Sequence, residues 1–154
     1  MVRKILIAVL WGWLCLPPAL AAEPEVMLPD SLHWVSPPWD PAVHAAWVLG
    51  SEQADGPYLL RVRIAPGGKI PPHTHPDERY TTVLSGTLHV SFGPDFNSAT
   101  AVVLPAGAVY VAPANQPHFI WVEDGEVMYQ EAGTGPTATL FSEPLTGGGA
   151  IPRR

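Results

Sequence analysis

The chain has 154 residues, of which 47% are apolar and 14% charged, so it can form a packed core and is unlike a disordered segment. Its 19 prolines and 14 glycines interrupt the sequence too often for long helices, which argues against a helical bundle or a coiled coil. The formal net charge of −6 argues against a surface that binds nucleic acid or anionic membranes.

Residues 1–21 are predicted to be a secretory signal peptide. Arg3 and Lys4 precede an apolar run over residues 5–16, and residues 19–21 (Ala-Leu-Ala) place small side chains where a signal peptidase cleaves. The apolar run is shorter than the ~20 residues that a membrane-spanning helix needs. We therefore expect a periplasmic or secreted protein that leaves the membrane after cleavage. Cys15, the only cysteine, would be removed with this segment, so disulfides and cysteine ligands are not expected.

Residues 22–42 contain several prolines together with Trp34 and Trp39. Because proline interrupts helices and indoles favour packed surfaces, this segment is predicted to be an extended arm that lies over the core.

Residues 43–146 are predicted to form an all-β domain. Short runs rich in β-branched and aromatic residues end at glycine- or proline-containing turns, as expected for an antiparallel sandwich or barrel. The expected strands are 45–49, 58–64, 80–84, 87–92, 101–104, 109–112, 119–122, 127–131 and 137–141. Residues 123–126 (Glu-Asp-Gly-Glu) indicate a hairpin between two of them. The three glycines at 147–149 open a tail, residues 147–154, that we expect to be flexible.

Three histidines are candidate metal ligands. His73 and His75 lie two residues apart on a proline-stiffened, extended stretch, so both imidazoles project to the same side. A third ligand must come from elsewhere in the fold, and His118, which follows a turn with two prolines, is the natural candidate. The alternative is that the H-x-H pair is a chance surface feature, in which case His118 is an ordinary loop residue.

The glycines and prolines around these histidines resemble the two sequence motifs of the cupin superfamily, and in particular of small single-domain type-2 cupins. The residues that match the first motif are Gly67, His73, His75 and Gly86. The residues that match the second are Gly107, Pro113 and His118, with Asn115 where the motif has glycine. This resemblance implies a double-stranded β-helix, or jelly-roll barrel, with a divalent metal in its mouth. It also implies a homodimer, formed by sheet packing or by exchange of the arm.

One departure from the first motif concerns its usual metal-binding glutamate, since Arg79 occupies that position and Glu78 precedes it. A β-bulge near residues 77–79 could turn Glu78 inward as a fourth ligand and Arg79 outward. Alternatively, Arg79 points inward and binds the carboxylate of an anionic substrate, and the metal is held by histidines alone. Of the two, we prefer the bulge.

The candidate substrate-binding residues are Arg79, Tyr110 and Gln130, which could face the cavity from neighbouring strands. Three histidines and at most one carboxylate leave coordination positions open, which is typical of an ion that binds substrate or dioxygen. We expect a metal-dependent enzyme, an oxygenase or an isomerase or lyase, acting on a small and possibly anionic molecule. The alternatives are a non-catalytic module that binds or senses a small ligand and a barrel whose metal is structural. The ion could be Zn, Mn, Cu, Ni or Fe, and export disfavours easily oxidised Fe(II).

Overall fold

The computed structural model describes residues 23–95 and 97–143. The predicted signal peptide and the predicted flexible tail lie outside these residues. Within the described part of the chain, no helix is long and apolar enough to cross a membrane.

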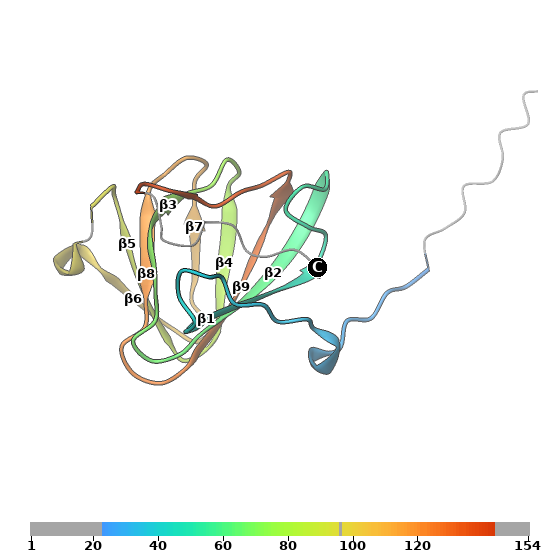
Figure 1. Ribbon diagram of the computed structural model, residues 1–154, viewed down its shortest axis with the longest axis horizontal. Helices are drawn as coiled ribbons and strands as arrows, with labels where there is room; N and C mark the ends of the chain where they lie inside the picture. Colours follow the sequence, from blue (N-terminus) through green and yellow to red (C-terminus); the bar gives the residue numbers. More distant parts are fainter. Residues whose placement is uncertain (1–22, 96, 144–154) are drawn as a thin grey trace, which may run out of the picture.

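In the described part of the chain, ten strands form two antiparallel five-stranded sheets that face each other (Figure 1). The first sheet has the order β1-β2-β9-β4-β7 and consists of β1 (Val43–Leu49), β2 (Gly56–Ile64), β9 (Val127–Gly135), β4 (Arg79–Ser85) and β7 (Val109–Ala112). The second has the order β10-β3-β8-β5-β6 and consists of β10 (Leu140–Phe141), β3 (Lys69–Thr74), β8 (His118–Trp121), β5 (Thr87–Phe92) and β6 (Val102–Pro105). The all-β jelly-roll prediction is confirmed.

The core lies between the sheets because every second side chain of a strand points to the same face. In β2, for example, Leu60, Val62 and Ile64 are buried, and their neighbours are half-buried. Strand β9 follows the same alternation, with Val127 and Tyr129 in the core.

The turns between strands mostly carry the chain from one sheet to the other. Residues 123–126 join β8 to β9, which lie in different sheets, so the predicted hairpin is wrong. Strand β9 pairs instead with β2 and β4. Gly86, between β4 and β5, has a φ of +77°, and a Cβ there would lie 2.5 Å from the backbone oxygen of Glu126. Only glycine fits this turn.

Strand β3 is the element that the sequence pattern did not reveal, because Pro71 and Pro72 lie inside it. Proline cannot donate to a sheet ladder. The pairing of β3 with β8 shifts register between Ile70 and His73, so the ladder is interrupted where the prolines lie. The extended stretch that carries the first histidine is thus part of a sheet.

The N-terminal arm contains a short 3-10 helix, η1 (Pro29–Ser31), and extends away from the barrel at its beginning (Figure 1). Nearer the barrel, Val35 bridges Ala45 of β1. The guanidinium of Arg63 lies 4.2 Å from the Trp34 ring centre. Trp39 packs edge-on against Phe141 with ring centres 5.2 Å apart.

Candidate metal centre

The three candidate histidines come together inside the barrel. His73 on β3 and His118 on β8 are partners in the sheet register, and His75 follows His73 by two residues on the same side. Their ring centres are 4.3 Å (His73–His118), 4.8 Å (His73–His75) and 5.2 Å (His75–His118) apart. One nitrogen from each lies within 4.8 Å of the others. All three side chains are buried.

Hydrogen bonds fix the tautomer of each histidine. The Nδ1 atoms of His73, His75 and His118 donate to the backbone oxygens of Pro71 (2.7 Å), Ala138 (2.8 Å) and Gln116 (3.1 Å). Because a carbonyl can only accept, each Nδ1 carries the proton and each Nε2 keeps its lone pair. Such backbone partners are typical of metal-binding histidines. The Nε2 of His75 is buried without a hydrogen-bond partner, which fits the expectation of a metal ligand.

The electrostatic environment keeps the imidazoles neutral, as ligands must be. Burial lowers the pKa of His73, and the neighbouring His118 lowers it further. Burial also lowers the pKa of His75, with Arg79 adding to the effect. The pKa of His118 is lowered chiefly by burial.

The turn before His118 also supports His75. Asn115 adopts a φ of 60°, the left-handed conformation that asparagine tolerates better than most residues. Its N–H donates to the backbone oxygen of His75 at 2.7 Å. Asparagine therefore replaces the motif's glycine without changing the turn, and this turn links the two histidine-bearing segments.

The structure corrects the preferred interpretation of Glu78. Strand β4 begins at Arg79 and pairs with β7 in continuous register from Arg79 to Thr82, so no register shift turns Arg79 outward. Glu78 is exposed and accepts a hydrogen bond from the Tyr80 hydroxyl, whereas Arg79 is only 3% exposed. The alternation of β4 places Arg79, Thr81 and Val83 inward, and Glu78 is not part of the histidine cluster.

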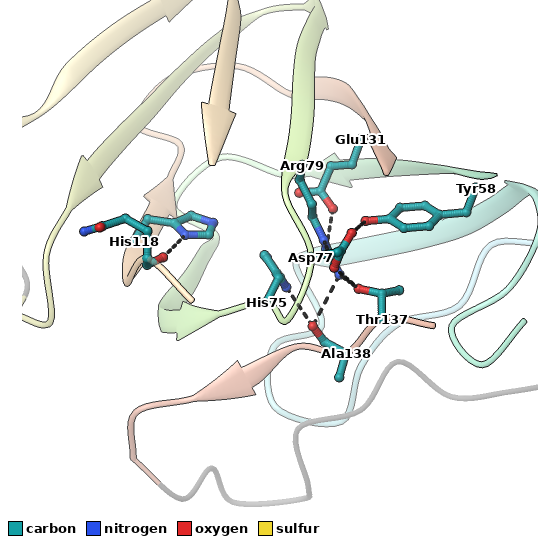
Figure 2. Close-up of polar contacts among 9 residues, drawn as sticks. Tyr58, His75, Asp77, Arg79, His118, Glu131, Thr137 and Ala138 are labelled. Carbon is teal, nitrogen blue, oxygen red and sulfur yellow. Dashed lines mark hydrogen bonds and ion pairs between the residues drawn. The ribbon is translucent and has the colours of Figure 1, made fainter. Parts of the chain in front are cut away.

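Arg79 is the centre of a buried polar network, which we call the Arg79 network (Figure 2). Its Nη1 donates to Glu131 at 2.6 Å, and its Nη2 donates to the Thr137 hydroxyl at 2.8 Å. Asp77 lies 3.7 Å from Nε and accepts hydrogen bonds from Tyr58 (2.6 Å) and Thr137. Burial is the largest single influence and lowers the pKa of the Arg79 guanidinium, but Glu131, Tyr58 and Asp77 together outweigh it, so the pKa is raised overall.

A cavity joins the histidines to this network. It has a volume of about 30 Å³, and its polar lining includes His73, His75, Arg79 and Glu131. Its apolar lining comes largely from β1, β2 and β3 and comprises Val43, Ala45, Leu60, Val62 and Ile70. Tyr129, Thr139 and Trp39 complete the lining.

Two of the three predicted substrate-binding residues lie elsewhere. Gln130 is on the other face of β9, where its Oε1 accepts a hydrogen bond from Arg61, so its assignment to the cavity is wrong. Tyr110 is buried beside His118, with ring centres 6.4 Å apart, and is not among the cavity-lining residues. Burial raises its pKa.

Glu131 is a site residue that the sequence interpretation missed. The expected strand ended at residue 131, whereas β9 continues to Gly135, so Glu131 seemed to lie at a strand end. The alternation of Val127, Tyr129 and Glu131 is the signal that places its carboxylate inward.

Comparisons with known proteins agree with this architecture. The cupin domain family matches residues 60–129. A germin-like protein, 1-1, of Oryza sativa subsp. japonica is 36% identical over 99 residues, covering 62% of this chain and 42% of that protein. The chain thus spans less than half the length of this relative.

Among solved structures, the polyketide cyclase RemF from Streptomyces resistomycificus superposes with a TM-score of 0.68 at 16% identity, covering 81% of this chain and 89% of its own. A sugar phosphate isomerase of the cupin superfamily from Silicibacter pomeroyi superposes with a TM-score of 0.62 at 16% identity. The match covers 78% of this chain and 83% of the isomerase chain. At this identity the likeness concerns the fold alone. The cupin domain match over residues 60–129, together with the two sequence motifs around the histidines, shows that the chain belongs to the cupin superfamily.

Proposed function

We propose that this protein is a metal-dependent enzyme of the isomerase or lyase type that acts on a small molecule inside the barrel. The observation that carries the proposal is the cluster of His73, His75 and His118, whose Nδ1 atoms all donate to backbone carbonyls and leave three Nε2 atoms for one divalent ion. Because Glu78 lies outside, these three ligands leave several coordination positions for substrate.

When bound, the ion would act as a Lewis acid that polarises a substrate oxygen. The chain itself supplies the groups around that oxygen. Glu131 lines the same cavity as His73 and His75, so its carboxylate is available to accept a proton from a bound substrate. Apolar side chains of β1 and β2 also line the cavity and disfavour water around a bound substrate. A proton acceptor beside the ligands favours isomerisation or elimination over oxygenation, which depends on dioxygen.

Two solved neighbours support this reaction class, because one is a polyketide cyclase and the other a sugar phosphate isomerase. The support is limited to the kind of chemistry that this barrel accommodates, since both neighbours are 16% identical to the chain.

Metal content is the first test. Elemental analysis of the purified protein is expected to find about one equivalent of Zn, Mn, Cu, Ni or Fe per chain. The His73→Ala/His75→Ala variant should lose it, while His33→Ala, which replaces an exposed histidine, should keep it. Equal metal contents in the two variants would refute the proposed site.

Activity is the second test. The loaded protein is incubated with panels of small hydroxy acids, keto acids and sugars, and products are followed by NMR alongside an oxygen electrode. Product formation without oxygen uptake supports the proposal. Oxygen uptake would assign an oxygenase instead, and ligand binding without turnover would assign a binding or sensing module.

We also propose that the protein is exported and dimeric. The composition of residues 1–21 supports export, and cell fractionation tests it. For the dimer, the support is an apolar surface on β4 and β7, where Tyr80, Val109 and Val111 are 42% to 58% exposed. Val111→Lys should halve the mass measured by light scattering, while Leu49→Lys on β1 should not.

A further inference from the structure

The buried polar groups beside the histidines carry an unbalanced charge. The side chains of Arg79, Glu131 and Asp77 are 4%, 5% and 10% exposed, so all three charges are largely shielded from water. One guanidinium and two carboxylates leave a formal charge of −1. Arg79 and Glu131 are the charged residues among the described ones that line the cavity, and Asp77, which does not line it, supplies the second negative charge 3.7 Å from the Nε of Arg79. Before any ion binds, the cavity should therefore attract cations and repel anions.

We propose that the ligand of this cavity is a small monocarboxylate with a short apolar body. This inference rests on the proposed function, because a divalent ion at the three histidines changes the local formal charge from −1 to +1. A single negative charge then balances the site, and an uncompensated charge is costly where water is excluded. Binding is ordered as a result, with the metal first and the carboxylate second.

Arg79 provides a hydrogen-bond donor for this ligand. Its Nη atoms donate to Glu131, Thr137 and the backbone oxygen of Ala138. Its Nε–H, in contrast, is buried without a hydrogen-bond partner, and the nearest carboxylate oxygen, on Asp77, is 3.7 Å away. A buried donor without an acceptor is destabilising, so an oxygen from a ligand would satisfy it. Hydrogen bonds between a guanidinium and a carboxylate are among the strong ones.

The size and lining of the cavity limit the rest of the ligand. The apolar side chains of Val43, Ala45, Leu60, Val62 and Ile70 face it. A volume of about 30 Å³ has room for two or three water molecules. The ligand body should therefore be an alkyl group of a few carbons. Each methylene that fits should tighten binding about fourfold, which corresponds to ~0.8 kcal/mol per buried CH₂.

Calorimetric titration of the full chain, in its metal-loaded and metal-free forms, tests the proposal. The probes are acetate, propanoate and butanoate, with propanamide as the neutral analogue of propanoate. Propanoate should bind the loaded protein at least about tenfold more tightly than propanamide does. It should show no binding to the metal-free protein. Equal affinities for propanoate and propanamide would overturn the inference.

Two variants change the charge in opposite directions. Arg79→Met should weaken propanoate binding and reduce the preference over propanamide. Glu131→Gln should tighten propanoate binding, a gain that misfolding cannot produce. Glu126→Gln makes the same change of charge on an exposed turn and serves as the matched control. If Glu131→Gln tightens binding no more than Glu126→Gln does, the proposal is wrong.

Metal content, measured on every sample, separates this inference from the proposed function. Bound metal without a preference for carboxylates overturns the inference alone. Failure of the wild-type protein to take up any divalent ion overturns both.

Discussion

Arg79 and Glu131 form an ion pair of 2.6 Å between neighbouring strands β4 and β9, inside the barrel and beside the histidine cluster. In the cupin motif the position of Arg79 carries a glutamate. Because this chain has Arg79 instead, the site lacks that carboxylate ligand. The guanidinium, which pairs with Glu131 on β9, places a buried hydrogen-bond donor in the cavity wall.

The Arg79 network predicts that substitutions of Arg79 and of Glu131 lower the free energy of unfolding by different amounts. Arg79→Met leaves the carboxylates of Glu131 and Asp77 buried without their cation, which should lower the free energy of unfolding by ~3–5 kcal/mol. Glu131→Gln should cost about 1–3 kcal/mol, because Arg79 keeps Thr137 as a partner. Urea unfolding measures both.

The control for these variants is Arg61→Met, which breaks a partly buried hydrogen bond to Gln130 on the other face of β9. Its cost should not exceed about 1 kcal/mol. If Arg79→Met destabilises the protein no more than Arg61→Met, the network does not stabilise the barrel.

Two glycines with similar backbone angles allow the cost of a Cβ clash to be distinguished from the cost of a positive φ. Gly86 (φ +77°) and Gly125 (φ +71°) both adopt left-handed conformations. A Cβ at Gly86 would meet the backbone oxygen of Glu126 at 2.5 Å, whereas one at Gly125 meets nothing within 4 Å.

Gly125→Ala should therefore cost only the conformational ~1–2 kcal/mol, and Gly86→Ala should cost clearly more because backbone atoms must move. Thermal and urea unfolding of both variants check this. Equal costs would mean that the turn between β4 and β5 relaxes freely.

Much of the fold follows from local pattern. The alternation of apolar residues and the position of turn residues predicted nine strands that overlap observed ones, although 127–131 falls four residues short of the end of β9 and 137–141 begins three residues before β10. Strand β3 was missed because Pro71 and Pro72 exclude regular pairing, and only the structure shows that β3 pairs on both sides of them. The predicted hairpin at residues 123–126 was wrong because a turn sequence does not reveal which sheet the next strand joins.

The histidine cluster was predictable from motif spacing, but the charged groups around it were not. Whether Arg79 or Glu78 faces inward depends on the register of β4 against β7, a long-range relationship. Glu131 is fifty-two residues from Arg79 in the chain, and a single sequence carries no signal that pairs them. Their association follows from the adjacency of β4 and β9.

The position of Glu78 predicts that it does not contribute to metal binding. Glu78 is exposed and bonded to Tyr80. Glu78→Gln should therefore leave the metal affinity unchanged, as measured by competition with a chelator of known affinity. His118→Ala removes one of three ligands and should weaken binding strongly. Weakened binding in Glu78→Gln would show that this carboxylate turns inward when the ion is present.

The buried histidines predict that the metal-free protein loses stability as pH falls. The folded state lowers the pKa of His73, His75 and His118 below the ordinary 6.5, chiefly by burial, so the unfolded chain binds more protons than the folded one below this pH. The contribution to stability is fully present above pH ~6.5 and declines below it, by at most ~1.4 kcal/mol per pH unit for each histidine.

Urea unfolding in a chelating buffer between pH 7.5 and 5.5 measures this slope before most carboxylates titrate. His75→Gln should remove about one third of it, because one of three titrating groups is lost. His33→Gln replaces an exposed histidine and should leave the slope unchanged. The same slope in all three proteins would mean that the cluster does not govern acid stability. Because protonation also displaces a metal from imidazole, the loaded protein should lose its ion over a lower range of pH, where unfolding and release become one transition.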